Sequence, residues 1–66
     1  MNITLNGKPY MLGQERSVAD LVRSLGFEGK RIAVERNGDI VPKSQHADTQ
    51  LNSDDIIEIV VAVGGG

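Results

Sequence analysis

The last three residues of the chain, Gly64, Gly65 and Gly66, have no side chains, and Gly66 carries the terminal carboxylate. Without a Cβ, such a segment can lie in a narrow channel, and nothing shields its terminal carbonyl from an attacking group. Three extended residues reach about 10 Å, which is enough to bring Gly66 into the active site of another protein. The pattern therefore predicts chemistry at the Gly66 carboxylate, with Gly64 and Gly65 as a slender lead-in.

This carboxylate needs activation before it can react. A terminal carboxyl group has a reference pKa of about 3.3–3.7, so at neutral pH it is ionised and a poor electrophile. The chain offers no phosphate-binding loop, because the terminal glycines are followed by neither a helix nor a lysine. We expect another protein to supply the activation. Glycines are also common at frayed chain ends. Here, however, they directly follow the best strand of the chain with no polar spacer between, which favours a functional terminus.

Other residues with reactive side chains lack the partners that catalysis requires. His46 is the only histidine, and its polar surroundings contain no cysteine, so we expect an exposed loop residue and no metal site. The pair Asp54-Asp55 directly precedes a strand and is best explained by turn formation.

The composition limits the remaining classes of function. The chain has 66 residues, no cysteine and a formal net charge of −2. Because small secreted domains usually need disulfides, we expect a cytoplasmic protein, monomeric when free. Scattered basic residues and only two aromatic residues argue against nucleic-acid binding. The longest apolar run, residues 59–63, is too short to cross a membrane.

A helix is predicted between two loops. Ser17 is placed to cap its N-terminus, with Asp20 at the spacing of a capping box. Apolar residues then follow at helical spacing, and Gly26 stands where a left-handed residue ends a helix. The apolar stripe consists of Val18, Leu21, Val22 and Leu25.

Strands are predicted on both sides of this helix. Asn6-Gly7 and Asn37-Gly38 each predict a tight hairpin turn, and Pro9 suits an edge strand. Residues 43–50 predict a polar loop with one helical turn. Residues 54–63 form the strongest strand, and we expect it at the centre of the sheet.

The final strand is apolar on nearly both faces. One face carries Ile57, Ile59, Val61 and Val63, and the other carries Ile56, Glu58, Val60 and Ala62. A strand of this kind is central, or has one face that binds a partner. Val60, Ala62 and Val63 are the candidate docking residues because they are apolar and close to the glycines.

The whole chain resembles the ThiS-type sulfur carrier proteins of thiamin biosynthesis, which belong to the ubiquitin-like β-grasp superfamily. The stretches that carry the resemblance are "ITLNG", "VERNGDIVPKSQHADTQL" and "DDIIEIVVAVGGG". It implies an α+β fold in which one mixed sheet packs against one main helix over residues 1–63, followed by a flexible tail at 64–66. One departure is Ser53-Asp54-Asp55, where the family often has Asp-Gly-Asp. Asp tolerates a left-handed conformation, so the turn can survive.

The resemblance also implies a mechanism and a set of partners. A ThiF-type activating enzyme would use ATP and magnesium to adenylate the Gly66 carboxylate. Sulfur from a cysteine desulfurase or related donor would convert it to a thiocarboxylate, and a ThiG-type thiazole synthase would accept that sulfur. The chain would be a carrier and cosubstrate, not an enzyme, with no cofactor or metal bound.

Three other functions share features of this pattern. The small subunit of molybdopterin synthase uses the same chemistry with a different acceptor, although such chains tend to be longer. A ubiquitin-like modifier would form isopeptide bonds with target lysines. A plain interaction module would not need Gly65 or Gly66 at all.

Overall fold

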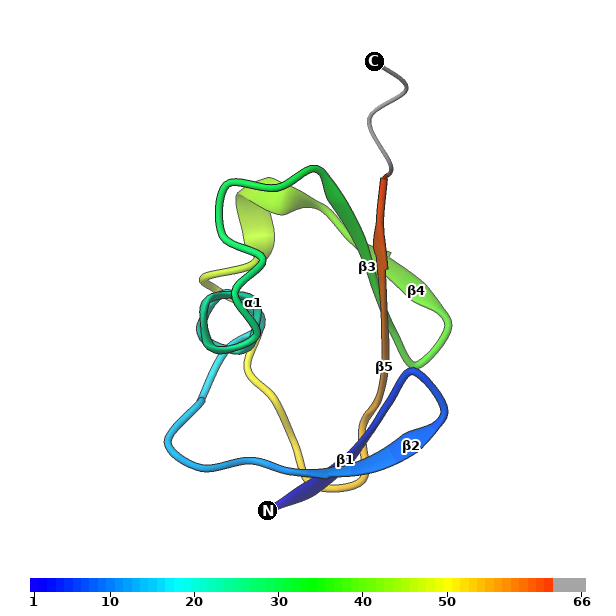
Figure 1. Ribbon diagram of the computed structural model, residues 1–66. Helices are drawn as coiled ribbons and strands as arrows, with labels where there is room; N and C mark the ends of the chain where they lie inside the picture. The colour runs from blue at the N-terminus through cyan, green and yellow to red at the C-terminus, as the bar shows by residue number, and fades with distance from the viewer. Residues whose placement is uncertain (63–66) are drawn as a thin grey trace.

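The computed structural model describes residues 1–62, and these form one sheet and one helix. The elements in chain order are β1 (Asn2–Leu5), β2 (Lys8–Met11), α1 (Val18–Ser24), β3 (Ile32–Arg36), β4 (Asp39–Val41), the 3₁₀ turn η1 (Lys43–Gln45) and β5 (Ile56–Val61). The strands are ordered β2-β1-β5-β3-β4. β5 pairs in parallel with β1 and antiparallel with β3, while α1 covers one side of the sheet (Figure 1). This is the predicted β-grasp fold, with β5 at the centre. The predicted boundary between residues 63 and 64 lies outside the described residues.

Both predicted hairpin turns are present. Asn6 and Gly7 have φ values of 50° and 81°, and Asn37 and Gly38 have values of 53° and 88°. Positive φ at both central residues gives the type I′ geometry that matches the twist of the flanking strands. Pro9 lies in β2, an edge strand of the sheet, where its missing N–H costs no ladder bond.

The asparagines of the two turns also hold β5. The Oδ1 atom of Asn6 accepts a hydrogen bond from the N–H of Ile59 at 2.8 Å. The Oδ1 atom of Asn37 accepts one from the N–H of Ile56 at 2.9 Å. Each turn therefore reaches across to the central strand, and the two hairpins help to fix the position of β5 in the sheet.

The helix begins and ends at the predicted residues. The Ser17 hydroxyl accepts the N–H of Asp20 at 3.1 Å, and the Asp20 carboxylate accepts the N–H of Ser17 at 3.2 Å, which completes the capping box. Gly26 adopts a φ of 80° after the last turn. The N–H of Phe27 then bonds to the carbonyl of Val22 at 3.0 Å, as in a Schellman motif.

The core lies between α1 and the covered face of the sheet. Val18 and Leu21 of the helix are fully buried, and they pack with Ile57 and Val34 of the sheet. Leu25, the last member of the predicted stripe, is only partly buried against this cluster. The remaining buried apolar residues are Ile3, Leu12, Val22, Val41, Leu51 and Ile59.

The prediction that His46 is an exposed loop residue is wrong. Only 9% of its surface is accessible, and its Nε2 lies 3.1 Å from the carbonyl oxygen of Val41, to which it can donate. Its own carbonyl accepts the N–H of Ala19 at 2.9 Å. The segment after η1 packs against the start of α1, so a histidine in a largely polar stretch of sequence becomes buried.

Candidate functional site

The chain leaves the described fold from the centre of the sheet. β5 ends at Val61, and Ala62 donates its N–H to the carbonyl of Arg31 at 2.8 Å. Figure 1 shows β5 pointing out of the fold at the end opposite the N-terminus. The candidate residues outside the described part of the chain are Val63, Gly64, Gly65 and Gly66. The roles predicted for these four residues remain predictions.

The two faces of β5 have different environments. Ile57 and Ile59 are buried beneath α1, at 0% and 5% exposure. Ile56 and Val60 alternate with them and are 53% and 63% exposed, on the face that the helix leaves uncovered. Ala62 is also exposed. The predicted docking residues Val60 and Ala62 are therefore accessible to a partner, as docking requires.

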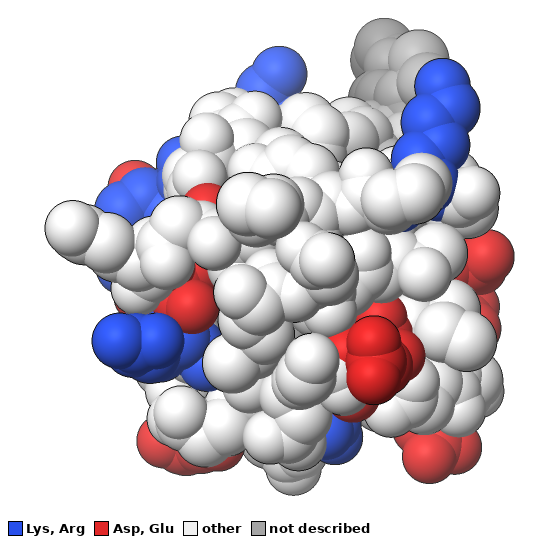
Figure 2. Space-filling model, turned by 90° about the horizontal axis from the view of Figure 1, so that it is seen from below, with Lys and Arg blue, Asp and Glu red and all other residues white. Residues whose placement is uncertain are grey.

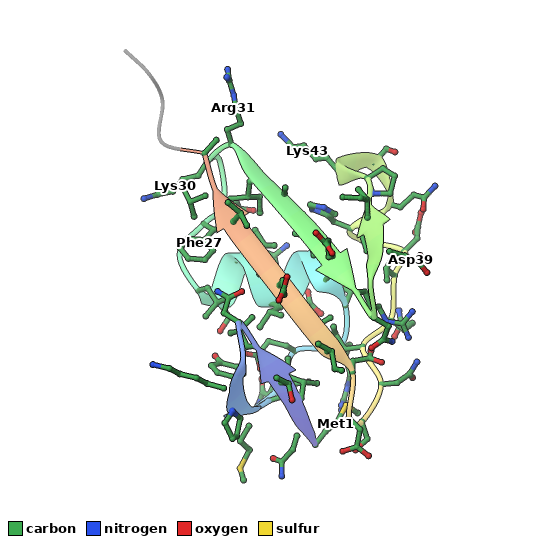
Figure 3. All side chains as sticks on the ribbon, turned by 90° about the vertical axis from the view of Figure 1, so that its right-hand side faces the viewer. Met1, Phe27, Lys30, Arg31, Asp39 and Lys43 are labelled. Atoms are coloured by element: carbon green, nitrogen blue, oxygen red, sulfur yellow. The ribbon has the colours of Figure 1, made fainter. Side chains whose placement is uncertain are left out.

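Neighbouring strands extend this uncovered surface. Met11 pairs with Asn2 and Ile40 pairs with Glu35, and the strand register places both on the same face as Ile56 and Val60. Met11 is 75% exposed and Ile40 is 65% exposed. Sequence reasoning missed both residues, because only the register across all five strands shows that they share a face. We call Met11, Ile40, Ile56 and Val60 the open face, which is turned toward the viewer in Figure 3.

Two carboxylates lie next to each other within this face. Glu35 of β3 is directly opposite Glu58 of β5 in the strand register. Neither forms an ion pair with another group of residues 1–62. Like charges directly opposite each other destabilise a sheet, so this pair lowers the stability of the free domain.

A buried carboxylate holds the start of β5 in place. Asp55 accepts hydrogen bonds from Nε of Arg36 at 2.8 Å, Nδ2 of Asn37 at 3.1 Å and the N–H of Asn52 at 2.8 Å. Burial alone would raise the pKa of Asp55, but these bonds outweigh it and hold the pKa below its ordinary value. Asp54 takes the predicted left-handed conformation, with a φ of 71°. Asp55 is thus a structural anchor as well as a turn residue.

Residues 1–62 show no group of acidic, histidine or cysteine side chains suited to a metal ion. In the same part of the chain, the helix is too short and too polar to span a bilayer. Two features of the described residues stand out: the open face, which also holds Glu35 and Glu58, and the exit of the chain beside it.

A β-grasp domain that sends its central strand out toward a terminal glycine run has the architecture of a ubiquitin-like protein. A family model described as "ThiS family" matches residues 3–66. The chain belongs to the ThiS family.

Similar proteins of known name agree with this assignment. The chain is 38% identical to "Sulfur carrier protein ThiS" of Bacillus subtilis over 65 residues, covering 97% of this chain and 98% of that protein. A solved structure of a thiamine biosynthesis protein (ThiS) from Geobacter metallireducens superimposes with a TM-score of 0.83 at 29% identity, covering 100% of both chains.

A second kind of relative is much longer. The chain is 39% identical over 66 residues to a protein named "Thiazole synthase" from Paramagnetospirillum magneticum. The match covers 100% of this chain but 20% of that protein, so the chain spans only about a fifth of this relative.

Proposed function

We propose that this chain is a sulfur carrier of thiamin biosynthesis and that Gly66 carries the sulfur as a thiocarboxylate. The observation that carries the proposal is the family match, which extends over residues 3–66 and so includes the terminal glycines. The name of the Bacillus subtilis relative supports the carrier role, and the thiazole synthase relatives support a ThiG-type partner.

The chemistry begins with activation by a ThiF-type enzyme. The Gly66 carboxylate attacks the α-phosphorus of ATP, with magnesium on the phosphates, and forms an acyl adenylate with release of pyrophosphate. The terminal sulfur of a persulfide, supplied by a cysteine desulfurase or related donor, then attacks the Gly66 carbonyl and expels AMP. A thiol cleaves the resulting S–S bond and leaves the thiocarboxylate. The chain is the cosubstrate in each step and uses no active site of its own.

The fold supports this role through geometry. β5 is anchored at its start by Asp55 and by its pairing with β1. Toward its end it pairs with β3, and the bond from the N–H of Ala62 to the carbonyl of Arg31 holds the exit against that strand. An enzyme that binds the terminal segment must then contact the sheet near that exit. We propose that it docks on the open face near Val60 and Ala62, and that it also contacts Val63, which precedes the glycines in the sequence. Burial of exposed apolar side chains would supply the affinity. We expect these encounters in the cytoplasm.

The test is the intact mass of the purified chain before and after incubation with a ThiF-type enzyme, ATP, magnesium and a sulfur donor. The expected change is the replacement of one oxygen by one sulfur. Met11 is highly exposed, and methionine oxidation adds almost the same mass, so fragmentation must place the change on Gly66. A chain that lacks Gly66 is the control and should stay unmodified.

The same experiment separates this proposal from the other functions. A branched conjugate on a lysine in place of a free thiocarboxylate would identify a modifier. An unchanged terminus with the activating enzyme and donor present would refute the carrier function. The thiocarboxylate chain would then be incubated with a ThiG-type synthase. Its return to the mass of the carboxylate form would show that the synthase accepts the sulfur.

A further inference from the structure

Three basic residues lie at the end of the sheet where the chain leaves the described fold. Arg31 lies opposite Ala62, as their backbone hydrogen bond shows, and Lys30 directly precedes it. β4 runs antiparallel to β3, so Lys43, two residues beyond β4, returns to the start of β3. Figure 3 shows all three side chains projecting from this end of the molecule. We call Lys30, Arg31 and Lys43 the exit cations.

The exit cations form no ion pairs with the acidic groups of residues 1–62, although the protein is acidic overall. Within residues 1–62, Arg23 pairs with acidic groups nearby and Arg36 pairs with Asp55, whereas none of the exit cations forms an ion pair. All three are exposed. Without them the chain would have four basic residues against nine acidic ones. On the face seen from the opposite end, acidic and basic side chains are scattered among uncharged ones (Figure 2).

The surface beside these cations is concave. A hollow of about 490 Å³ lies beside the C-terminal half of α1, with the exit cations among the residues that line it. Apolar side chains of Val22, Phe27 and Ile32 also line it. Arg23 and Glu28 line it too, and they pair with each other at 3.5 Å. The cations are exposed, and they are not buried donors converging on one point. Such a surface suits an extended acidic segment of a protein better than a small anion.

We propose that the exit cations dock an acidic surface of the activating enzyme, beside the channel that receives the terminal glycines. This inference rests on the proposed function. The four residues after Ala62 span at most about 14 Å when extended, so an enzyme that reaches Gly66 must come close to the exit. Cations at that edge attract carboxylates on the enzyme and orient the carrier with its terminus first. Charges of this kind act on the encounter rate and weaken as salt rises.

The test compares two double variants with the same change in charge. Lys30→Glu with Lys43→Glu alters the exit, and Lys8→Glu with Arg16→Glu alters exposed cations elsewhere that form no ion pair in residues 1–62. Pyrophosphate release by the ThiF-type enzyme gives KM and kcat for each carrier at low and physiological salt. Melting curves check that all variants are folded.

The exit variant should raise KM by about tenfold at low salt, with kcat unchanged, because steering by charge changes association by factors of 10 or more. Its KM should also depend less on salt than that of the wild type. An equal rise in the Lys8 and Arg16 variant, or no rise in the exit variant, would overturn the inference. Saturable binding of pyrophosphate to the free wild-type chain, lost in the exit variant, would overturn it in favour of a small-anion site. If the ThiF-type enzyme releases no pyrophosphate with the wild-type chain, the proposed function is refuted, and the inference that rests on it is refuted as well.

Discussion

Replacement of Asp55 by Asn should destabilise the domain strongly at neutral pH. The Asp55 side chain is only 7% exposed and accepts three hydrogen bonds, one of them from the guanidinium of Arg36. An Asn side chain keeps one acceptor oxygen but turns an NH₂ group toward at least one of these donors. Hydrogen bonds to charged groups contribute about 1.5–3 kcal/mol each, so we expect a loss of about 2–3 kcal/mol. A domain of this size has roughly 3–10 kcal/mol in total.

The destabilisation caused by Asp55→Asn should depend on pH, and the lowered pKa of Asp55 determines the direction of that dependence. Because the folded state holds the pKa of Asp55 below its unfolded value, the ionised carboxylate stabilises the fold. This contribution is fully present above the unfolded pKa of about 3.9, and it is lost as the pH falls through the folded pKa. The difference between wild type and Asp55→Asn should therefore be largest near neutral pH and shrink on acidification.

Urea unfolding followed by circular dichroism, repeated from pH 7 downward, measures this difference. Asp54→Asn is the matched control, because Asp54 is an exposed neighbour and Asn tolerates the same positive φ. The control should change the free energy of unfolding by less than about 0.5 kcal/mol. The reasoning would be refuted if both variants lost the same amount, or if the Asp55→Asn difference stayed constant down to acidic pH.

Three further substitutions test other parts of the structure. Val60→Asp should leave the melting temperature near that of the wild type, because Val60 is exposed. It should raise KM for the ThiF-type enzyme about tenfold or more. The control Gln14→Asp, at an exposed loop position, should change neither quantity. Ser17→Ala should lower the free energy of unfolding by about 1 kcal/mol through loss of the helix cap, and an effect no larger than that of Ser44→Ala would contradict this assignment. Glu58→Gln should stabilise the free domain by about 0.2–1 kcal/mol at low salt, since it removes the repulsion with Glu35, and the gain should disappear in high salt.

The sequence alone specified the elements whose cause is local. The two Asn-Gly turns, the Ser17 cap and the Gly26 terminus each depend on residues within a few positions, and all of them form as predicted. The central place of β5 was also predictable, because one strand is apolar on nearly both faces. The terminal glycines could be recognised from the sequence as the candidate reactive end of the chain. The family that they suggested is confirmed by the match over residues 3–66.

The tertiary structure decided which distant residues share a surface or a hydrogen-bond network. His46 is buried because its segment packs on α1, and Asp55 is an anchor because the β3–β4 turn reaches it across the sheet. The exit cations come from separate segments that β-strand pairing returns to one edge, and the open face gathers side chains from three strands in the same way. Local composition carries no information about such pairings, because register and packing are set by the whole sheet at once.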